Sequence, residues 1–222
     1  MPNMEKYHSI QKKLKQEHVC LVAVSKTKPS EAILDLYERG QRVFGENRVQ
    51  ELVDKQVALP KDIQWHMIGH LQRNKVKYLA SFVSLVHTVD SLRLLEEINK
   101  QAKKKERVID CLLQFHIAME ENKFGLSIEE AQGILDSVSY RSMENIRICG
   151  VMGMASFVGD TQQIRKEFQT LKKYQEHLKK TYFTRSDAFK ECSMGMSGDY
   201  ELAVEEGSTM VRIGSLLFGN RK

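Results

Sequence analysis

The sequence has 222 residues, 41% hydrophobic and 28% charged, and its 34 basic and 29 acidic residues leave a formal net charge of +5. This composition is that of a globular protein with room for one large core, which excludes a disordered or fibrous chain. The basic residues form no stripe interleaved with aromatic residues, so we expect no binding of nucleic acid.

The compartment can be predicted from what the chain lacks. Residues 1–16 are polar and charged, unlike the apolar centre of a signal peptide, and no apolar run is long enough to span a membrane. The cysteines are far apart in sequence and mostly lie in or beside apolar runs, as is typical of reduced, buried thiols: Cys20, Cys111, Cys149 and Cys192. We therefore expect a cytoplasmic protein that makes no membrane contact.

Short apolar segments alternate with helical patterns along the whole chain. The apolar segments predict strands at residues 19–24, 42–44, 64–68, 82–87, 108–115, 146–152, 191–194 and 210–213. The helical patterns begin at recognisable positions, namely Pro29-Ser30, Ser91, Ser127 and Asp160. Eight strands that alternate with helices predict a parallel sheet closed into a single-domain (β/α)8 barrel over residues 1–222. A doubly wound open sheet stays an alternative, because several predicted strands have only three or four residues.

Lys26 is the first candidate functional residue. It follows the apolar run of residues 19–24, at the carboxyl end of a predicted strand, where α/β proteins place their ligand sites. Apolar walls would remove water from its amine and lower its pKa, so that the amine could attack a carbonyl group. A surface lysine after a strand is the alternative.

Asn47 and two histidines follow the next strands. Gly45 allows a tight exit from a strand, and Asn47 then either contacts a ligand or caps the following helix. His66 and His70 are four residues apart, but Gly69 does not suit a helix interior and no glutamate follows His66, so we expect no metal site there.

The segments after the last two predicted strands contain small residues. Ser197 and Gly198 precede a predicted helix over residues 199–206, and Gly214 and Ser215 follow the last strand. In barrels, these two loops often bind phosphate through backbone N–H groups and hydroxyls. We therefore expect a phosphate site here.

Arg212 lies inside the last apolar strand. Alternation along the strand places Arg212 and Gly214 on one face, and Val211 and Ile213 on the other. A buried guanidinium needs a partner, which is either a structural ion pair or an atom of a ligand.

These residues resemble a known family. The chain is similar to the pyridoxal 5′-phosphate (PLP) homeostasis proteins, which are related to the barrel domain of alanine racemase. The resemblance spans nearly the whole chain and rests on the motifs at residues 23–29, 44–47, 65–75, 120–125, 193–197 and 211–214.

The resemblance implies a role for each candidate residue. Lys26 would form the Schiff base with PLP, and Arg212 would face the pyridine nitrogen. Ser197, Gly214 and Ser215 would bind the phosphate, and Asn47 would lie beside the ring. Ser215 stands where the family usually has threonine, and its hydroxyl can still reach a phosphate. Gly153 and Gly198 also replace commoner family residues, with no consequence that we can derive.

The same resemblance implies a PLP carrier or regulator and not an enzyme. An arginine opposite the pyridine nitrogen can only donate hydrogen bonds, which leaves that nitrogen unprotonated and weakens carbanion stabilisation. We also expect the chain to lack the second domain that supplies a tyrosine base in alanine racemase. A low-turnover amino-acid racemase and a barrel that binds another phosphorylated metabolite are the alternatives.

The partners expected from the resemblance are PLP and PLP-dependent apo-enzymes that receive it. We expect a monomer, because no exposed apolar helix face is unambiguous in the sequence. Three further lysines lie near predicted strand ends or loops: Lys28, Lys75 and Lys123. We expect them to be solvated, with a role as secondary amine sites for PLP as the alternative.

Overall fold

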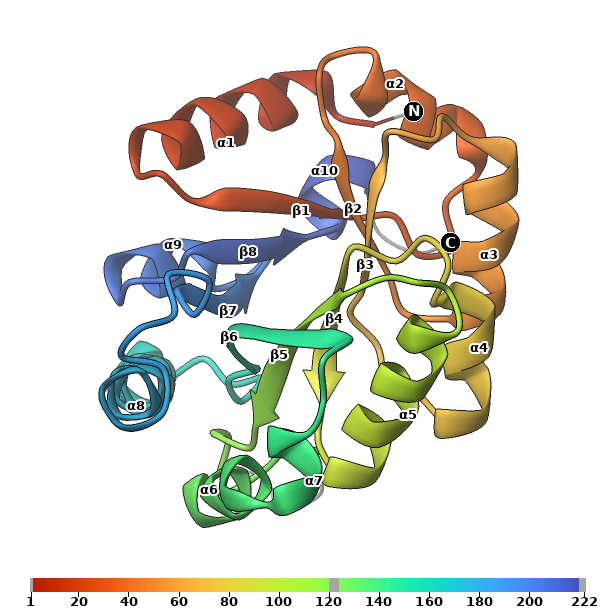
Figure 1. Cartoon of the computed structure of the whole chain (residues 1–222). Coiled ribbons are helices and arrows are strands. Elements are labelled where there is room, and N and C mark those ends of the chain that lie inside the picture. The colour runs from red at the N-terminus through yellow and green to blue at the C-terminus, as the bar shows by residue number, and fades with distance from the viewer. Residues whose placement is uncertain (1, 120–123, 220–222) are drawn as a thin grey trace.

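The computed structural model describes residues 2–119 and 124–219, which include eight strands in a closed parallel barrel that follows sequence order. Figure 1 shows the strands in the middle of the molecule with the longer helices around them. The strands are β1 (Cys20–Val24), β2 (Val43–Glu46), β3 (Gln64–Met67), β4 (Leu85–Val89), β5 (Ile109–Phe115), β6 (Ile146–Gly153), β7 (Glu191–Met196) and β8 (Met210–Ile213).

Helices lie between successive strands, and two more, α1 and α10, precede β1 and follow β8. The helices are α1 (Met4–Gln16), α2 (Ser30–Tyr37), α3 (Val49–Ala58), η1 (Arg73–Lys75), α4 (Val76–Leu79), α5 (Leu92–Lys103), α6 (Ile128–Asp136), α7 (Val138–Arg141), α8 (Thr161–Thr181), α9 (Tyr200–Glu205) and α10 (Ser215–Phe218). Among these described helices, none combines the length and the apolar character needed to cross a membrane.

The pairing of the first and last strands distinguishes a barrel from an open sheet. β1 pairs with β8 in parallel, with Val22 opposite Arg212 and Ala23 opposite Ile213. The predicted (β/α)8 barrel is therefore confirmed, and the open doubly wound sheet is wrong.

Side chains alternate between two layers along each strand. Leu21 and Ala23 pack outward against the helices in the large core, whereas Val22 and Val24 pack with Ile68 inside the barrel. This is the period-two alternation expected of a strand whose two faces are both buried. Polar side chains on the inner face consequently lie inside a closed barrel.

The predicted strand boundaries differ from the observed ones mainly at β4 and β2. Residues 82–84 are not part of β4, because the N–H groups of Phe82 and Val83 donate to Leu79 O and continue the turn of the preceding helix. β2 runs through Gly45 to Glu46, so Gly45 is not the exit from a strand. A side chain at Gly45 would come within 2.9 Å of Val22 Cγ1 and Ile68 Cδ1, so glycine allows close packing inside the barrel.

Candidate functional site

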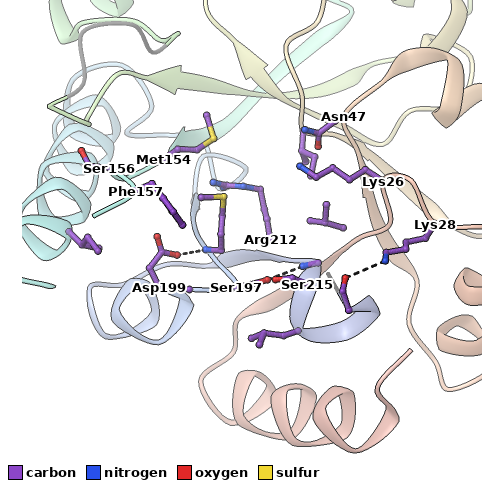
Figure 2. Close-up of a pocket in the computed structure, with 18 of the residues that line it drawn as sticks. Lys26, Lys28, Asn47, Met154, Ser156, Phe157, Ser197, Asp199, Arg212 and Ser215 are labelled. Carbon is purple, nitrogen blue, oxygen red and sulfur yellow. Dashed lines mark hydrogen bonds between the residues drawn. The ribbon is translucent and has the colours of Figure 1, made fainter. Parts of the chain in front are cut away.

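A cavity of about 640 Å³ opens at the carboxyl end of the barrel. It is lined by all six residues predicted to bind a cofactor, which are Lys26, Asn47, Ser197, Arg212, Gly214 and Ser215. Figure 2 shows Lys26 extending towards Asn47 on one side of the cavity, with Ser197 and Ser215 on another. The volume is within the range of about 300–1,000 Å³ that is usual for small-molecule sites.

Lys26 reaches the cavity from the turn that follows β1. Val24, at the end of that strand, and Ile68 contribute apolar lining, and Lys26 itself is half-buried. Lys26 therefore lies on the cavity, and its role towards a ligand stays a prediction. The neighbouring Ser25 is fully buried, and Thr27 has a φ of 63°, so the turn has a defined and unusual backbone shape.

Asn47 lies on the cavity and does not cap the following helix. The N-cap of α3 is Arg48, and no side chain makes the capping hydrogen bond there. Gly69 packs so closely on this turn that a side chain at Gly69 would lie 2.3 Å from the backbone oxygen of Asn47. Helix capping by Asn47 is therefore wrong, whereas its contact with a ligand stays a prediction.

Arg212 is buried inside the barrel at the base of the cavity. Its Nη1 donates to Ser193 Oγ at 2.6 Å, and its Nη2 donates to Gly153 O at 2.9 Å. Both partners are neutral oxygens, unlike the carboxylate of a structural ion pair. Burial lowers the pKa of Arg212 to about 10, against the opposing effect of the Asp199 charge, so the group is cationic at neutral pH.

A buried chain of hydrogen bonds continues from Arg212 across the barrel. Ser193 Oγ lies 2.9 Å from His87 Nδ1, and His87 Nε2 lies 3.0 Å from His66 Nδ1. Because Arg212 can only donate, we assign the Ser193 hydroxyl as donor to His87, which then donates from Nε2 to His66. Both imidazoles are therefore assigned as neutral.

Burial keeps both imidazoles uncharged. It lowers the pKa of His66 to about 4. It also lowers the pKa of His87 well below its usual value, assisted by repulsion from His66 when that ring is protonated and from the Arg212 cation. The sequence motif at residues 65–75 contained His66, but only the inward alternation of β3, β4 and β7 brings His66, His87 and Ser193 together.

The small residues after β7 and β8 form one edge of the cavity. Gly214 N donates to Ser197 Oγ at 3.3 Å, which joins the two loops, and Ser215 begins α10. No atom lies within 4 Å of the position that a side chain at Gly198 would take, so this edge is open. Hydroxyls and backbone N–H groups in such an arrangement suit a phosphate group.

Sequence reasoning missed a second wall of the cavity. Met154, Ser156, Phe157 and Val158 follow β6 and line the cavity, and their position after a strand end could have identified them. Glu167 on α8 fixes this segment, because its carboxylate accepts hydrogen bonds from the backbone N–H and the hydroxyl of Ser156, both at 2.7 Å.

The predictions for the three further lysines have different outcomes. Lys28 was expected to be solvated, but it is half-buried and lines the cavity, where its Nζ donates to Phe218 O at 3.0 Å and Gly219 O at 3.2 Å. Carbonyl groups at the end of a helix need hydrogen-bond donors from outside it, which explains why Lys28 contacts α10 and is not solvated as expected. Lys75 is exposed, as expected. Lys123 and residues 120–122 of the motif at 120–125 lie outside the described residues.

Comparison with known proteins identifies the family. The model of the family described as "Alanine racemase, N-terminal domain" matches residues 4–222. The pyridoxal phosphate homeostasis protein of Aquifex aeolicus (strain VF5) is 40% identical over 203 residues, which cover 91% of this chain and 87% of that protein. The chain belongs to the pyridoxal phosphate homeostasis protein family. The human member is also 40% identical, over 90% of this chain and 76% of its own length.

Solved structures support the family assignment and the fold. PipY of Synechococcus elongatus PCC7942 has been solved without PLP (TM-score 0.89, 34% identity) and with PLP bound (TM-score 0.86, 33% identity), each covering 97% of this chain and 99% of PipY. Alanine racemase from Bartonella henselae matches at 15% identity with a TM-score of 0.68, over 96% of this chain and 58% of the racemase, and shows the shared barrel fold alone.

Proposed function

We propose that this family member binds pyridoxal 5′-phosphate in the cavity at the carboxyl end of its barrel and serves PLP homeostasis. One observation carries the proposal: the amine of Lys26, the buried guanidinium of Arg212 and an edge that contains the Ser197 hydroxyl line the same cavity. The relative solved with PLP bound shares this fold over nearly its whole length, which supports the choice of ligand.

The lining residues fit the three chemical parts of PLP. The amine of Lys26 suits the aldehyde, which it would hold as a Schiff base. Ser197, Gly214 and Ser215 suit the phosphate, and Asn47 suits the ring. The remaining N–H donors of Arg212 suit an unprotonated pyridine nitrogen, because a guanidinium has five donors, of which one donates to Ser193 and one to Gly153.

We infer further that the chain holds PLP without substantial catalysis and passes it to apo-enzymes. PLP supplies an electron sink to enzymes that keep its pyridine nitrogen protonated, and Arg212 opposes that protonation. Besides Lys26 and Arg212, the charged residues among the described lining of the cavity are Lys28 and Asp199, and neither is the tyrosine that racemases of this fold use as their second base. Holding the aldehyde on one amine limits its reaction with others. A monomer in the cytoplasm is part of this proposal.

The visible spectrum of the purified protein tests the proposal. PLP added to the wild-type chain is expected to give the absorbance band of a protonated Schiff base, and Lys26→Ala is expected to lack it. A chiral assay with alanine and serine separates the carrier from the racemase alternative. Turnover near the value typical of enzymes, about 10 per second, would overturn the carrier proposal. Absence of the band in wild-type protein would overturn PLP binding through Lys26.

A further inference from the structure

Four polar side chains lie packed together between the barrel and α3, next to the turn that carries Lys26. We call this group the Lys55 cluster; it consists of Ser25, Glu46, Glu51 and Lys55. Lys55 is 6% exposed, and its amine donates to Glu46 Oε1 at 2.7 Å, to Glu51 Oε1 at 2.6 Å and to the backbone oxygen of Ser25 at 2.8 Å. An ammonium group has three donors, so all three are used.

The Lys55 cluster holds the backbone on both sides of Lys26. Before Lys26, Ser25 is held through its backbone oxygen by Lys55, and its hydroxyl donates to Glu46 Oε1 at 2.6 Å. After Lys26, the backbone N–H of Thr27 donates to Glu51 Oε1 at 2.6 Å. The charged side chains of the Lys55 cluster therefore fix the residues that precede and follow Lys26.

The backbone at this turn needs such support. Thr27 has a φ of 63°, in the left-handed region that a β-branched residue rarely adopts. A strained conformation persists only where the surroundings hold it, and strain of this kind gathers at functional sites. The Glu51 carboxylate supplies part of the support, because it accepts the hydrogen bond of the strained residue itself.

Stability alone does not account for the Lys55 cluster. Burying charges costs solvation that their mutual attraction repays only in part, and apolar side chains of similar volume often serve stability as well or better. Burial raises the pKa of Glu46 despite the nearby Lys55 ammonium. Among the described residues, Glu46 Oε2 is buried without a hydrogen-bond partner. Incompletely satisfied polar groups of this kind call for another explanation.

We propose that Glu46, Glu51 and Lys55 are positioning residues that orient Lys26 for covalent capture of a pyridoxal-type aldehyde, an inference that rests on the proposed function. In the captured state, the neutral Lys26 amine and the aldehyde carbon share a C=N bond, and the aldehyde oxygen leaves as water with the two amine hydrogens. The hydrogen bonds of the Lys55 cluster reach Ser25 and Thr27, on either side of Lys26. Among the described residues, none of these bonds reaches the phosphate edge, so the cluster acts on the position of this amine. Loss of the Lys55 cluster should slow covalent capture while sparing non-covalent binding.

Two ligands separate these effects. PLP reports covalent capture, through the rate at which the Schiff-base band appears and through trapping with borohydride. 4′-Deoxypyridoxine phosphate has a methyl group in place of the aldehyde and cannot form the C=N bond, so its Kd reports non-covalent binding to the same cavity. We expect Lys55→Met and Glu51→Ala to slow capture at least about tenfold while changing the Kd of the analogue less than about threefold.

Matched variants complete the test. Glu51→Gln keeps an oxygen that can accept from Thr27, so it should recover most of the capture rate that Glu51→Ala loses. Lys61→Met is the lysine control, because Lys61 donates to Gln56 O and Val57 O at the far end of the same helix and should leave capture unchanged. Thermal unfolding confirms that each variant is folded, and Glu51→Ala serves if Lys55→Met is not, because the Glu51 side chain is 22% exposed.

The possible outcomes are distinct. An unchanged capture rate in folded Lys55→Met or Glu51→Ala overturns the positioning role. Equal losses in capture rate and in analogue affinity also overturn it, because they indicate a general structural role. If wild-type protein binds the analogue but captures no PLP, or binds neither, it is the proposed function that fails.

Discussion

The hydroxyl of Ser193 joins Arg212 to His87 inside the barrel: Arg212 Nη1 lies 2.6 Å from Ser193 Oγ, which lies 2.9 Å from His87 Nδ1. One small side chain thus accepts a hydrogen bond from a buried cation and donates one to a neutral imidazole. Ser193 is fully buried, so no solvent can replace either bond. The direction of the whole chain follows from the arginine, which has donors only.

Replacement of Ser193 by alanine is expected to destabilise the fold. Ser193→Ala removes the acceptor of Arg212 and the donor to His87, and each unsatisfied buried group costs about 1–3 kcal/mol. The free energy of unfolding, measured with urea, should fall by at least this amount. Ser139→Ala is the control, because Ser139 donates to Glu96 at an exposed position and should change stability by less than about 0.5 kcal/mol. Equal effects of the two variants would contradict the assigned network.

Stability is expected to fall at acid pH because of His66 and His87. Burial holds the pKa of His66 at about 4 in the folded chain, against 6.5 for an exposed histidine. It also holds the pKa of His87 well below 6.5. Below pH 6.5 the unfolded chain therefore binds protons that the folded chain does not, and the free energy of unfolding decreases as pH falls. His66 alone should account for about 3 kcal/mol at pH 4.

The variant His66→Asn isolates this effect from that of the carboxylates. The asparagine oxygen can still accept from His87, but it does not titrate. The slope of unfolding free energy against pH between 6 and 4 should become flatter by up to about 1.4 kcal/mol per pH unit. An identical slope in wild type and His66→Asn would mean that His66 is not buried in the neutral form.

Removal of the Ser197 hydroxyl is expected to weaken binding of the phosphate group selectively. Ser197 lines the cavity and accepts from Gly214 N, at the edge assigned to phosphate. A hydrogen bond to a charged group contributes about 1.5–3 kcal/mol, so Ser197→Ala should weaken PLP binding at least about tenfold. Pyridoxal, which has no phosphate, serves as the matched ligand and should bind both proteins alike. Similar losses for both ligands would place the phosphate elsewhere.

Much of the fold could be predicted from the sequence, because the relevant signals are local. The apolar runs located all eight strands, and Ser127 with Glu130 forms the predicted capping box of α6. The sequence predicts the start of β4 too early, because Phe82 and Val83 are as apolar as the residues of a strand. They pack as the end of a helical turn, and periodicity cannot distinguish the two in so short a run.

The site residues that follow strand ends could be predicted from the sequence. The contacts between side chains of neighbouring strands could not. Lys26, Asn47, Ser197 and Ser215 could be named because the carboxyl ends of parallel strands gather at one face. The contact of His66 with His87 depends on which residues of β3 and β4 point inward at the same height. That is set by strand register, which a single sequence does not contain.

The most direct test of the account is to map where PLP becomes attached to the protein. Wild-type protein is mixed with PLP, reduced with borohydride, digested and analysed by mass spectrometry. We predict one phosphopyridoxyl group per chain, on Lys26, and no comparable labelling of Lys28, which also lines the cavity. Labelling spread over other lysines with Lys26 unmodified would contradict the account.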